Sequence, residues 1–165
     1  MADFLIGCTH FGHKRIIDLA NRPFESVEEM DETLIRNWRR VVKPDDVVYH
    51  LGDVGDPETL GKLTGRIVQI RGNHDSHKIK STHYAEVRHN KRLLCLFHYP
   101  IEDWNEWHKG AIHLHAHTHS HAFRSAERRG NVCVEAIDYT PVRLEDAVER
   151  LIGGESDKRI SAAPT

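Results

Sequence analysis

The sequence lacks the features that mark several large classes of protein. It contains three cysteines in 165 residues, too few for a disulfide framework, and no apolar run close to the roughly 18 residues that a membrane-spanning helix needs. Its formal net charge of −2 at pH 7 offers no electrostatic attraction to duplex nucleic acid or to an anionic membrane surface. We therefore expect neither duplex nucleic acid nor a membrane among its partners.

Neither end of the chain has a marked sequence pattern. The first residues lead directly into the apolar segment Phe4-Leu5-Ile6, without the basic stretch and longer apolar run of a signal peptide. Together with the small number of cysteines, this predicts a cytoplasmic protein. Neither an internal repeat nor a linker divides the chain. We expect one domain over residues 1–152 and a polar, disordered tail over residues 153–165.

The first half of the chain has the hydrophobic periodicity of alternating strands and helices. Short apolar runs predict strands over residues 4–6, 47–51 and 66–71. A capping box that starts at Ser26 opens a helix that extends to about Val41, and a short helix is expected over residues 57–63. This alternation is typical of right-handed crossover connections and a parallel sheet.

The second half of the chain has a different pattern. Two predicted strands, residues 84–88 and 93–97, flank a hairpin turn, and apolar runs predict further strands over 111–115 and 131–136. Residues 144–152 have the apolar spacing of an amphipathic helix. The whole pattern predicts an α/β domain.

Histidine is strongly over-represented. The chain has 14 histidines, and five of them occupy every second position from His113 to His121. Histidine is the commonest metal ligand in proteins and an acid or base near neutral pH. A solvated polar strand face is the alternative explanation, and for any single histidine it is the stronger one. Those outside the ligand motifs, such as His113 and His115, would at most form an outer shell.

Seven residues with metal-binding side chains lie where predicted strands end. They are Cys8, His10, Asp53, Asn73, His98, His117 and His119. Two divalent ions roughly 3.5–4 Å apart need about seven or eight donor atoms, one of them bridging, so this number fits a dinuclear centre. A single structural zinc ion instead needs four ligands, usually with cysteines in CxxC spacing, which is absent here.

The motifs around these residues, in this order, resemble those of the calcineurin-like metallophosphoesterase family over about residues 4–134. They are Cys8-x-His10, Gly52-Asp53, Gly72-Asn73-His74-Asp75, His98, and Ala116-His117-Thr118-His119. The segments Thr9-His10-Phe11-Gly12-His13 and Asn21-Arg22-Pro23-Phe24 resemble small, capless bacterial and phage members in particular. The resemblance implies a single-domain, four-layer αββα sandwich.

The resemblance also implies a centre for two divalent or trivalent transition-metal ions, namely zinc, manganese or iron. One ion would be held by Cys8, His10, Asp53 and His119, and the other by Asp53, Asn73, His98 and His117. The implied reaction is hydrolysis of a phosphodiester or phosphomonoester bond by a hydroxide that bridges the ions. In this reaction His74, oriented by Asp75, would protonate the leaving group as general acid.

The implied substrate is a small phosphate ester, with nucleotides among the candidates. It would bind in an open cleft, because 165 residues leave no room for a cap domain. We expect His13, Asn73 and Trp104 to contact it. Cys95 and Cys133 lie in apolar strands and are expected to be small core residues.

Two positions depart from the family pattern. Ala116 stands where the family has glycine, which predicts only a different backbone approach. Cys8 stands where the family has aspartate, and a thiolate favours zinc or iron over magnesium or manganese. Three interpretations of Cys8 are open. Its sulfur binds metal, it is an inert thiol beside a weakened first metal site, or the site has lost its catalytic activity. The alternatives to an enzyme are therefore a catalytically weakened scaffold for partner proteins and a redox-sensitive metal site.

Overall fold

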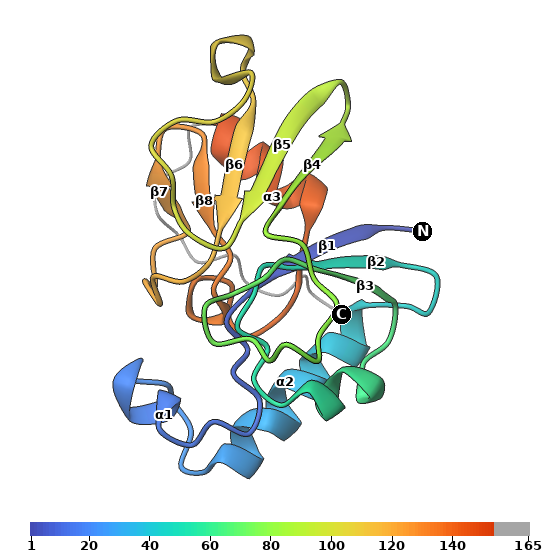
Figure 1. Cartoon of the computed structure of the whole chain (residues 1–165), viewed down its shortest axis with the longest axis vertical. Helices are drawn as coiled ribbons and strands as arrows, with labels where there is room; N and C mark the ends of the chain where they lie inside the picture. Colours follow the sequence, from blue (N-terminus) through green and yellow to red (C-terminus); the bar gives the residue numbers. More distant parts are fainter. Residues whose placement is uncertain (154–165) are drawn as a thin grey trace.

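The computed structural model describes residues 1–153 and contains two β-sheets (Figure 1). The first sheet has the strand order β3-β2-β1-β9, formed by Arg66–Gln69, Val47–His50, Asp3–Ile6 and Val142–Arg143. Strands β1, β2 and β3 are parallel, and β9 runs antiparallel to β1 at the edge. Burial on both faces explains the near-continuous apolar sequences of β1 and β2. From residue 154 on, the predicted tail lies outside the described residues.

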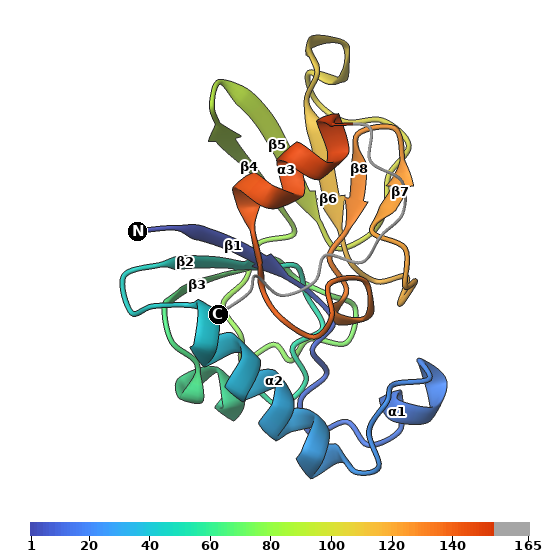
Figure 2. The same cartoon turned by 180° about the vertical axis from the view of Figure 1, so that it is seen from behind.

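Helix α2 (Val27–Val41) lies on the side of the first sheet that faces away from the second (Figure 1 and Figure 2). It begins at Ser26, whose hydroxyl accepts a hydrogen bond from the amide of Glu29 at 3.1 Å, as the capping box predicts. Its predicted apolar face is confirmed, because Met30, Leu34 and Trp38 are all buried. A single-turn helix, α1 (Ile16–Leu19), precedes it. The short helix predicted after β2 is the 3-10 helix η1 (Pro57–Lys62).

The second sheet has five strands in the order β4-β5-β6-β8-β7. Their bounds are Tyr84–His89, Arg92–Phe97, Ile112–His115, Arg129–Asn131 and Arg124–Ala126. The predicted hairpin between β4 and β5 is confirmed. At its tip Asn90 and Lys91 have φ values of 48° and 67°, the left-handed pair that a two-residue type I′ turn requires.

The prediction of a strand over residues 131–136 is wrong in extent. Strand β8 ends at Asn131, whose side-chain oxygen accepts a hydrogen bond from the amide of Cys133 at 3.0 Å. The chain then turns into the 3-10 helix η3 (Val134–Ala136), and Cys133 forms only an isolated parallel bridge with Gly7. Strands β7 and β9 were not predicted, because two or three residues are too few to show an alternation.

Strand β6 presents different side chains on its two faces. Ile112 and Leu114 enter the main core, whereas His113 and His115 point to the opposite face. The loop between β5 and β6 covers that opposite face with Trp104, which packs in a separate cluster with Leu93, Cys95 and Ala111. This loop includes the 3-10 helix η2 (Trp107–Lys109).

The last helix, α3 (Leu144–Ile152), contacts β1 and β9 of the first sheet and β8 of the second (Figure 2). It therefore lies in the angle between the two sheets. Of its predicted apolar face Leu144, Val148 and Leu151 are buried, whereas Ile152 at its end is exposed. The predicted single-domain α/β sandwich is confirmed, with two sheets and few helices. Its covering is uneven, since a helix covers the outer face of the first sheet and a loop covers that of the second. None of the helices within residues 1–153 has the length and apolarity needed to cross a bilayer.

Candidate metal centre

Side chains from both sheets meet at the carboxyl ends of their strands. The loops that follow β1, β2 and β3 contribute Cys8, His10, Asp53, Asn73 and His74. The ends of β5 and β6 contribute His98, His117 and His119. Hydrogen bonds, ion pairs and ring contacts join all eight residues into one cluster. All seven predicted ligands therefore lie at one site, where the two sheets meet.

The ring of His98 faces the side-chain oxygens of Asn73 and Asp53. The Nδ1 atom of the buried His98 ring lies 2.7 Å from the carbonyl oxygen of Leu51, so Nδ1 carries the ring proton. The other ring nitrogen, Nε2, lies 3.0 Å from Asn73 Oδ1 and 3.5 Å from Asp53 Oδ2. In the neutral ring Nε2 is an acceptor, so three acceptors face one another without a donor. A cation at this point would satisfy all three, and the residues present therefore fit a metal ion.

His10 supplies a further unsatisfied acceptor. Its Nε2 atom is buried, has no hydrogen-bond partner and lies 3.6 Å from Asp53 Oδ2. Burial, and then the positive charge of Arg22, lower the pKa of His10 from 6.5 to about 2, so the ring stays neutral and able to bind a cation. Its Nδ1 atom lies 3.4 Å from Nδ1 of His13, so His13 is next to the cluster.

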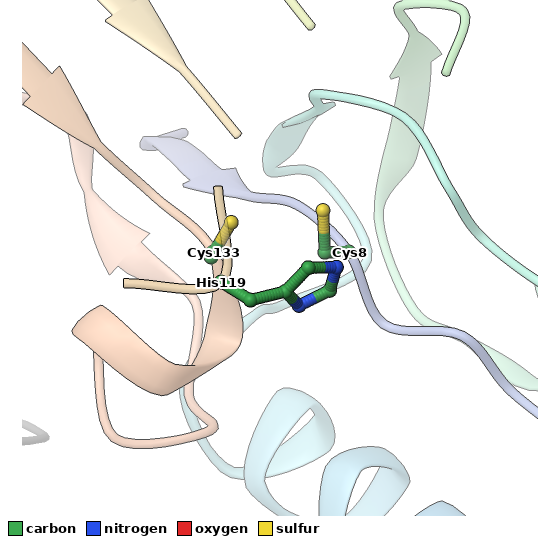
Figure 3. Close-up of side chains that lie close together, drawn as sticks. All are labelled: Cys8, His119 and Cys133. Carbon is green, nitrogen blue, oxygen red and sulfur yellow. The ribbon is translucent and has the colours of Figure 1, made fainter. Parts of the chain in front are cut away.

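The sulfur of Cys8 belongs to two groups of ligand-type atoms. One group is Cys8, Asp53 and His98, and the other is Cys8, His119 and Cys133 (Figure 3). Within each group all the ligand atoms lie within 4.8 Å of one another. The residue common to both groups is Cys8, whereas the resemblance implies that Asp53 is shared. Cys133 is buried, as expected of a core residue, but it also borders the centre.

The environment of Cys8 determines the state of its thiol. The amide of His117 donates a hydrogen bond to Cys8 Sγ at 3.2 Å. Burial, followed by the neighbouring Cys133 thiol, raises the pKa of Cys8 well above its ordinary value. A cation that binds this sulfur must therefore displace a proton.

His119 is oriented by a buried ion pair that the sequence analysis did not identify. Its Nδ1 atom donates to Glu135 Oε1 at 3.0 Å, which leaves Nε2 as the acceptor. The same carboxylate oxygen accepts from Arg22 Nε at 2.9 Å, and both of these side chains are completely buried. Arg22 also donates to the carbonyl oxygens of Thr9 and Cys8 at 2.9 and 2.6 Å. Burial alone would raise the pKa of Glu135, but the hydrogen bond from His119 and the charge of Arg22 outweigh it and lower the pKa.

The backbone at the centre is strained. Five of the seven predicted ligands have a φ between 51° and 66°, in the left-handed region: Cys8, His10, Asp53, His117 and His119. Outside glycine this conformation costs roughly 1–2 kcal/mol per residue, and it persists where the surrounding structure holds the residue in place. Such strain concentrates at functional sites, which agrees with the position of the cluster.

Three glycines provide the close approach that the cluster needs. A Cβ atom on Gly72 would lie 2.2 Å from Asp53 Oδ1, and one on Gly52 would lie 2.6 Å from His98 Nδ1. A Cβ atom on Gly7 would lie 2.6 Å from the Cβ of Ala116. The alanine that departs from the family pattern is thus accommodated by a glycine on the neighbouring strand end.

The GNHD motif places its last two side chains differently. His74 is exposed, its amide donates to Asp53 Oδ1 at 2.9 Å, and its ring centroid lies 5.9 Å from that of His10. The expectation that Asp75 orients His74 does not hold. The buried Asp75 carboxylate accepts hydrogen bonds from the amides of Gly72 at 2.7 Å, Val54 at 2.8 Å and Asp53 at 3.1 Å. Asp75 thereby ties the loop after β3 to the loop after β2.

The prediction that Trp104 contacts substrate is wrong. Trp104 is 8% exposed, its Nε1 donates to the carbonyl of Ala111 at 3.1 Å, and its ring packs on the outer face of the second sheet. The aromatic side chain beside the centre is Tyr99, which is exposed and whose ring centroid lies 4.7 Å from that of His117. Its position directly after His98 is the signal that could have identified it.

Known proteins are similar to all or part of this chain. Residues 1–136 match the family described as the calcineurin-like phosphoesterase superfamily domain. An uncharacterized protein of Methanocaldococcus jannaschii, MJ1445, is 38% identical over 171 residues, covering 96% of this chain and 96% of that protein. The gene 66 protein of Mycobacterium phage L5 is 34% identical over 97 residues, covering 48% of this chain and 46% of that protein.

Solved structures share the fold. A protein of unknown function from Aquifex aeolicus, AQ665, superposes with a TM-score of 0.72 at 25% identity, over 92% of this chain and 99% of that chain. Vps29 of Chaetomium thermophilum superposes with a TM-score of 0.51 at 12% identity, over 78% of this chain and 70% of that chain. The second similarity concerns the fold alone.

Proposed function

The chain belongs to the calcineurin-like phosphoesterase superfamily, and from this premise we propose that it hydrolyses phosphate esters with two transition-metal ions. The observation that carries the proposal is the set of acceptors without donors: His98 Nε2, Asn73 Oδ1 and Asp53 Oδ2, with the unpartnered His10 Nε2 next to them. The side chains of His10, Asp53 and His98 are buried, and buried acceptors of this kind are costly unless a cation satisfies them. Bound metal ions supply an activated water near neutral pH and neutralise phosphate charge.

Residues of the chain would bind the ions and supply the proton for the leaving group. The seven predicted ligands would hold the ions, and the hydrogen bond from His98 to Leu51 fixes the tautomer that leaves Nε2 available. His74 is the general acid in this proposal, because its ring is exposed and borders the cluster beside His10. The loss of such a proton donor typically lowers the rate about 10²–10⁴-fold.

The proposed substrates are small phosphate esters, which would bind where the centre meets solvent. His13, Asn73 and Tyr99 border the centre, and both Asn73 and Tyr99 are exposed. The ring of Tyr99 offers an apolar face to an aromatic leaving group, such as a nucleobase or a phenyl ring. Cys8 favours zinc or iron at its half of the centre, because sulfur is a softer ligand than the carboxylate of the family pattern.

The proposal is tested by adding metals back to chelated protein and measuring hydrolysis of phenyl and p-nitrophenyl phosphate mono- and diesters. Asp53→Asn should abolish both metal uptake and hydrolysis, since it removes a charge that the cations need. His74→Ala should keep the metal content of the wild type. Its rate loss should be larger for phenyl than for p-nitrophenyl esters, because p-nitrophenolate leaves without protonation.

The control is His83→Ala, which removes an exposed histidine in the segment before β4 and should match the wild type. Wild-type rates in both Asp53→Asn and His74→Ala would refute the proposal. Equal losses for the two leaving groups would exclude His74 as the general acid while leaving the metal centre intact.

A non-catalytic alternative has one observation in its favour, the replacement of the family aspartate by Cys8. A catalytically weakened member that serves as a scaffold should take up no stoichiometric metal and should not be stabilised by added zinc or manganese. Metal analysis after dialysis against each ion distinguishes this alternative from the enzyme.

A further inference from the structure

We propose that Cys133 is a metal ligand, so that one half of the centre is a sulfur-rich site for a soft divalent cation, formed by Cys8, His119 and Cys133. The inference rests on the proposed function for the presence of a metal centre and deepens it by one ligand. Cys133 lies outside every motif that carries the family resemblance. The chemical class of the preferred ion is that of Zn²⁺, Co²⁺ and Cd²⁺, which bind thiolate and imidazole together.

The backbone holds Cys133 beside Cys8, although the two residues lie near opposite ends of the chain. Cys133 forms a parallel bridge with Gly7, and the amide of Val134 donates to the carbonyl of Gly7 at 3.1 Å. On its other side the Cys133 amide is held by the side chain of Asn131 at 3.0 Å. The two sulfur positions are therefore set by backbone pairing and not by mobile loops.

The donor atoms are close enough to share one ion. The sulfur atoms of Cys8 and Cys133 and a ring nitrogen of His119 all lie within 4.8 Å of one another, and Figure 3 shows them gathered from three separate segments. Zinc–sulfur bonds are about 2.3 Å long, so two sulfurs on a tetrahedral ion lie about 3.8 Å apart. The upper limit of 4.8 Å exceeds this separation by about 1 Å.

His119 is already prepared for this role. Because its Nδ1 proton is committed to Glu135, Nε2 presents its lone pair. A carboxylate behind a ligating histidine fixes its orientation and raises its basicity.

Cys95 shows what an ordinary buried thiol looks like in the same molecule. It is as inaccessible as Cys133, yet it packs with Leu93, Trp104 and Ala111 on the far face of the second sheet. Its sulfur contacts the carbonyl of Asn105 at 3.8 Å and belongs to neither ligand group within residues 1–153. Burial alone therefore does not account for the position of Cys133, and Cys95 provides a matched control.

The experiment counts sulfur ligands directly by X-ray absorption at the zinc edge of the metal-loaded full chain. We expect two sulfur scatterers at about 2.3 Å per dinuclear centre of the wild type, which the spectrum averages to one per zinc ion, one per centre in Cys133→Ser and two per centre in Cys95→Ser. Cobalt-substituted protein should show thiolate-to-metal charge-transfer absorption that falls by about half in Cys133→Ser and not in Cys95→Ser. Zinc affinity should fall by more than the roughly 10–100-fold typical of losing an outer-shell partner.

A single sulfur scatterer per dinuclear centre of the wild type would overturn the inference without any variant, even if Cys133→Ser failed to fold. Unchanged sulfur counts in a folded Cys133→Ser protein would overturn it as well. The proposed function fails separately. Two bound sulfurs without ester hydrolysis would refute the enzyme and keep this ligand set, whereas hydrolysis with one bound sulfur would do the reverse.

Discussion

The buried pair of Arg22 and Glu135 gives the sharpest prediction for stability. Substitution of Glu135 by glutamine keeps the shape of the side chain but removes its negative charge. Arg22 would then remain as a positive charge with no exposure to water and without its anionic partner, next to neutral acceptors such as the carbonyl oxygens of Thr9 and Cys8. We expect a large loss of stability even in metal-free protein.

The magnitude follows from the complete burial of both side chains. Removal of one partner from a buried ion pair costs about 3–5 kcal/mol, because the remaining charge stays desolvated. The glutamine oxygen can still accept a hydrogen bond from Arg22, so we expect about 3 kcal/mol, the lower end of that range. For a chain of this size, 1 kcal/mol corresponds to about 2–4 °C, and the melting temperature should therefore fall by about 6–12 °C.

The assay is urea and thermal denaturation of chelated protein, so that ligation by His119 does not contribute. The control is Glu106→Gln, whose partner Arg88 has a side chain that is 57% exposed. Screening by water should leave the free energy of unfolding of this control unchanged within error. A double variant, Arg22→Met with Glu135→Gln, should lose less than the sum of the two single losses. The reasoning is refuted if Glu135→Gln destabilises the protein no more than Glu106→Gln does.

Three further predictions test other parts of the structure. Asp46→Asn should destabilise the protein at pH 7, because amide hydrogen bonds from Lys43 and then Ala2 hold the pKa of Asp46 below its ordinary value. This contribution is present above the unfolded pKa and disappears as the pH falls through the folded one, so the deficit in urea denaturation should vanish in acid. Trp104→Ala should cost about 3–5 kcal/mol of unfolding free energy while the metal content stays unchanged; a selective loss of activity would contradict its structural assignment. Cys8→Asp should shift metal uptake from zinc toward manganese in a competition measured by elemental analysis, and an unchanged ratio would show that Cys8 is not a ligand.

The sequence predicted the parts of the fold that have long or regular patterns. The capping box at Ser26 and the apolar spacing of Met30, Leu34 and Trp38 correctly located α2, because a helix of 15 residues repeats its signal several times. The hairpin tip at Asn90 was also found. Strands β7 and β9 were missed, because their two or three residues carry no period, and their pairing is set by partners distant in sequence.

The sequence identified the site residues that directly follow predicted strands. It did not identify those that lie inside an apolar run. Glu135 and Cys133 stand among valines and alanines, so their segment reads as an ordinary core strand. Only the folded structure brings Glu135 next to Arg22 and Cys133 next to Cys8. Trp104 was misassigned because sequence position after His98 does not show which face of the sheet a loop covers.

The ligands of the centre come from both halves of the sandwich, since Cys8 and Asp53 follow strands of the first sheet while His98 and His119 follow strands of the second. Under the proposed ligand assignment each ion would bind residues of both sheets and would act as a non-covalent cross-link between the halves. A ligand that binds only the assembled form contributes about 4 kcal/mol at a thousandfold excess over its dissociation constant. Removal of the metal should therefore weaken the contact between the two sheets as well as abolish hydrolysis. The cooperativity with which the whole chain unfolds would then depend on how fully the metal sites are occupied.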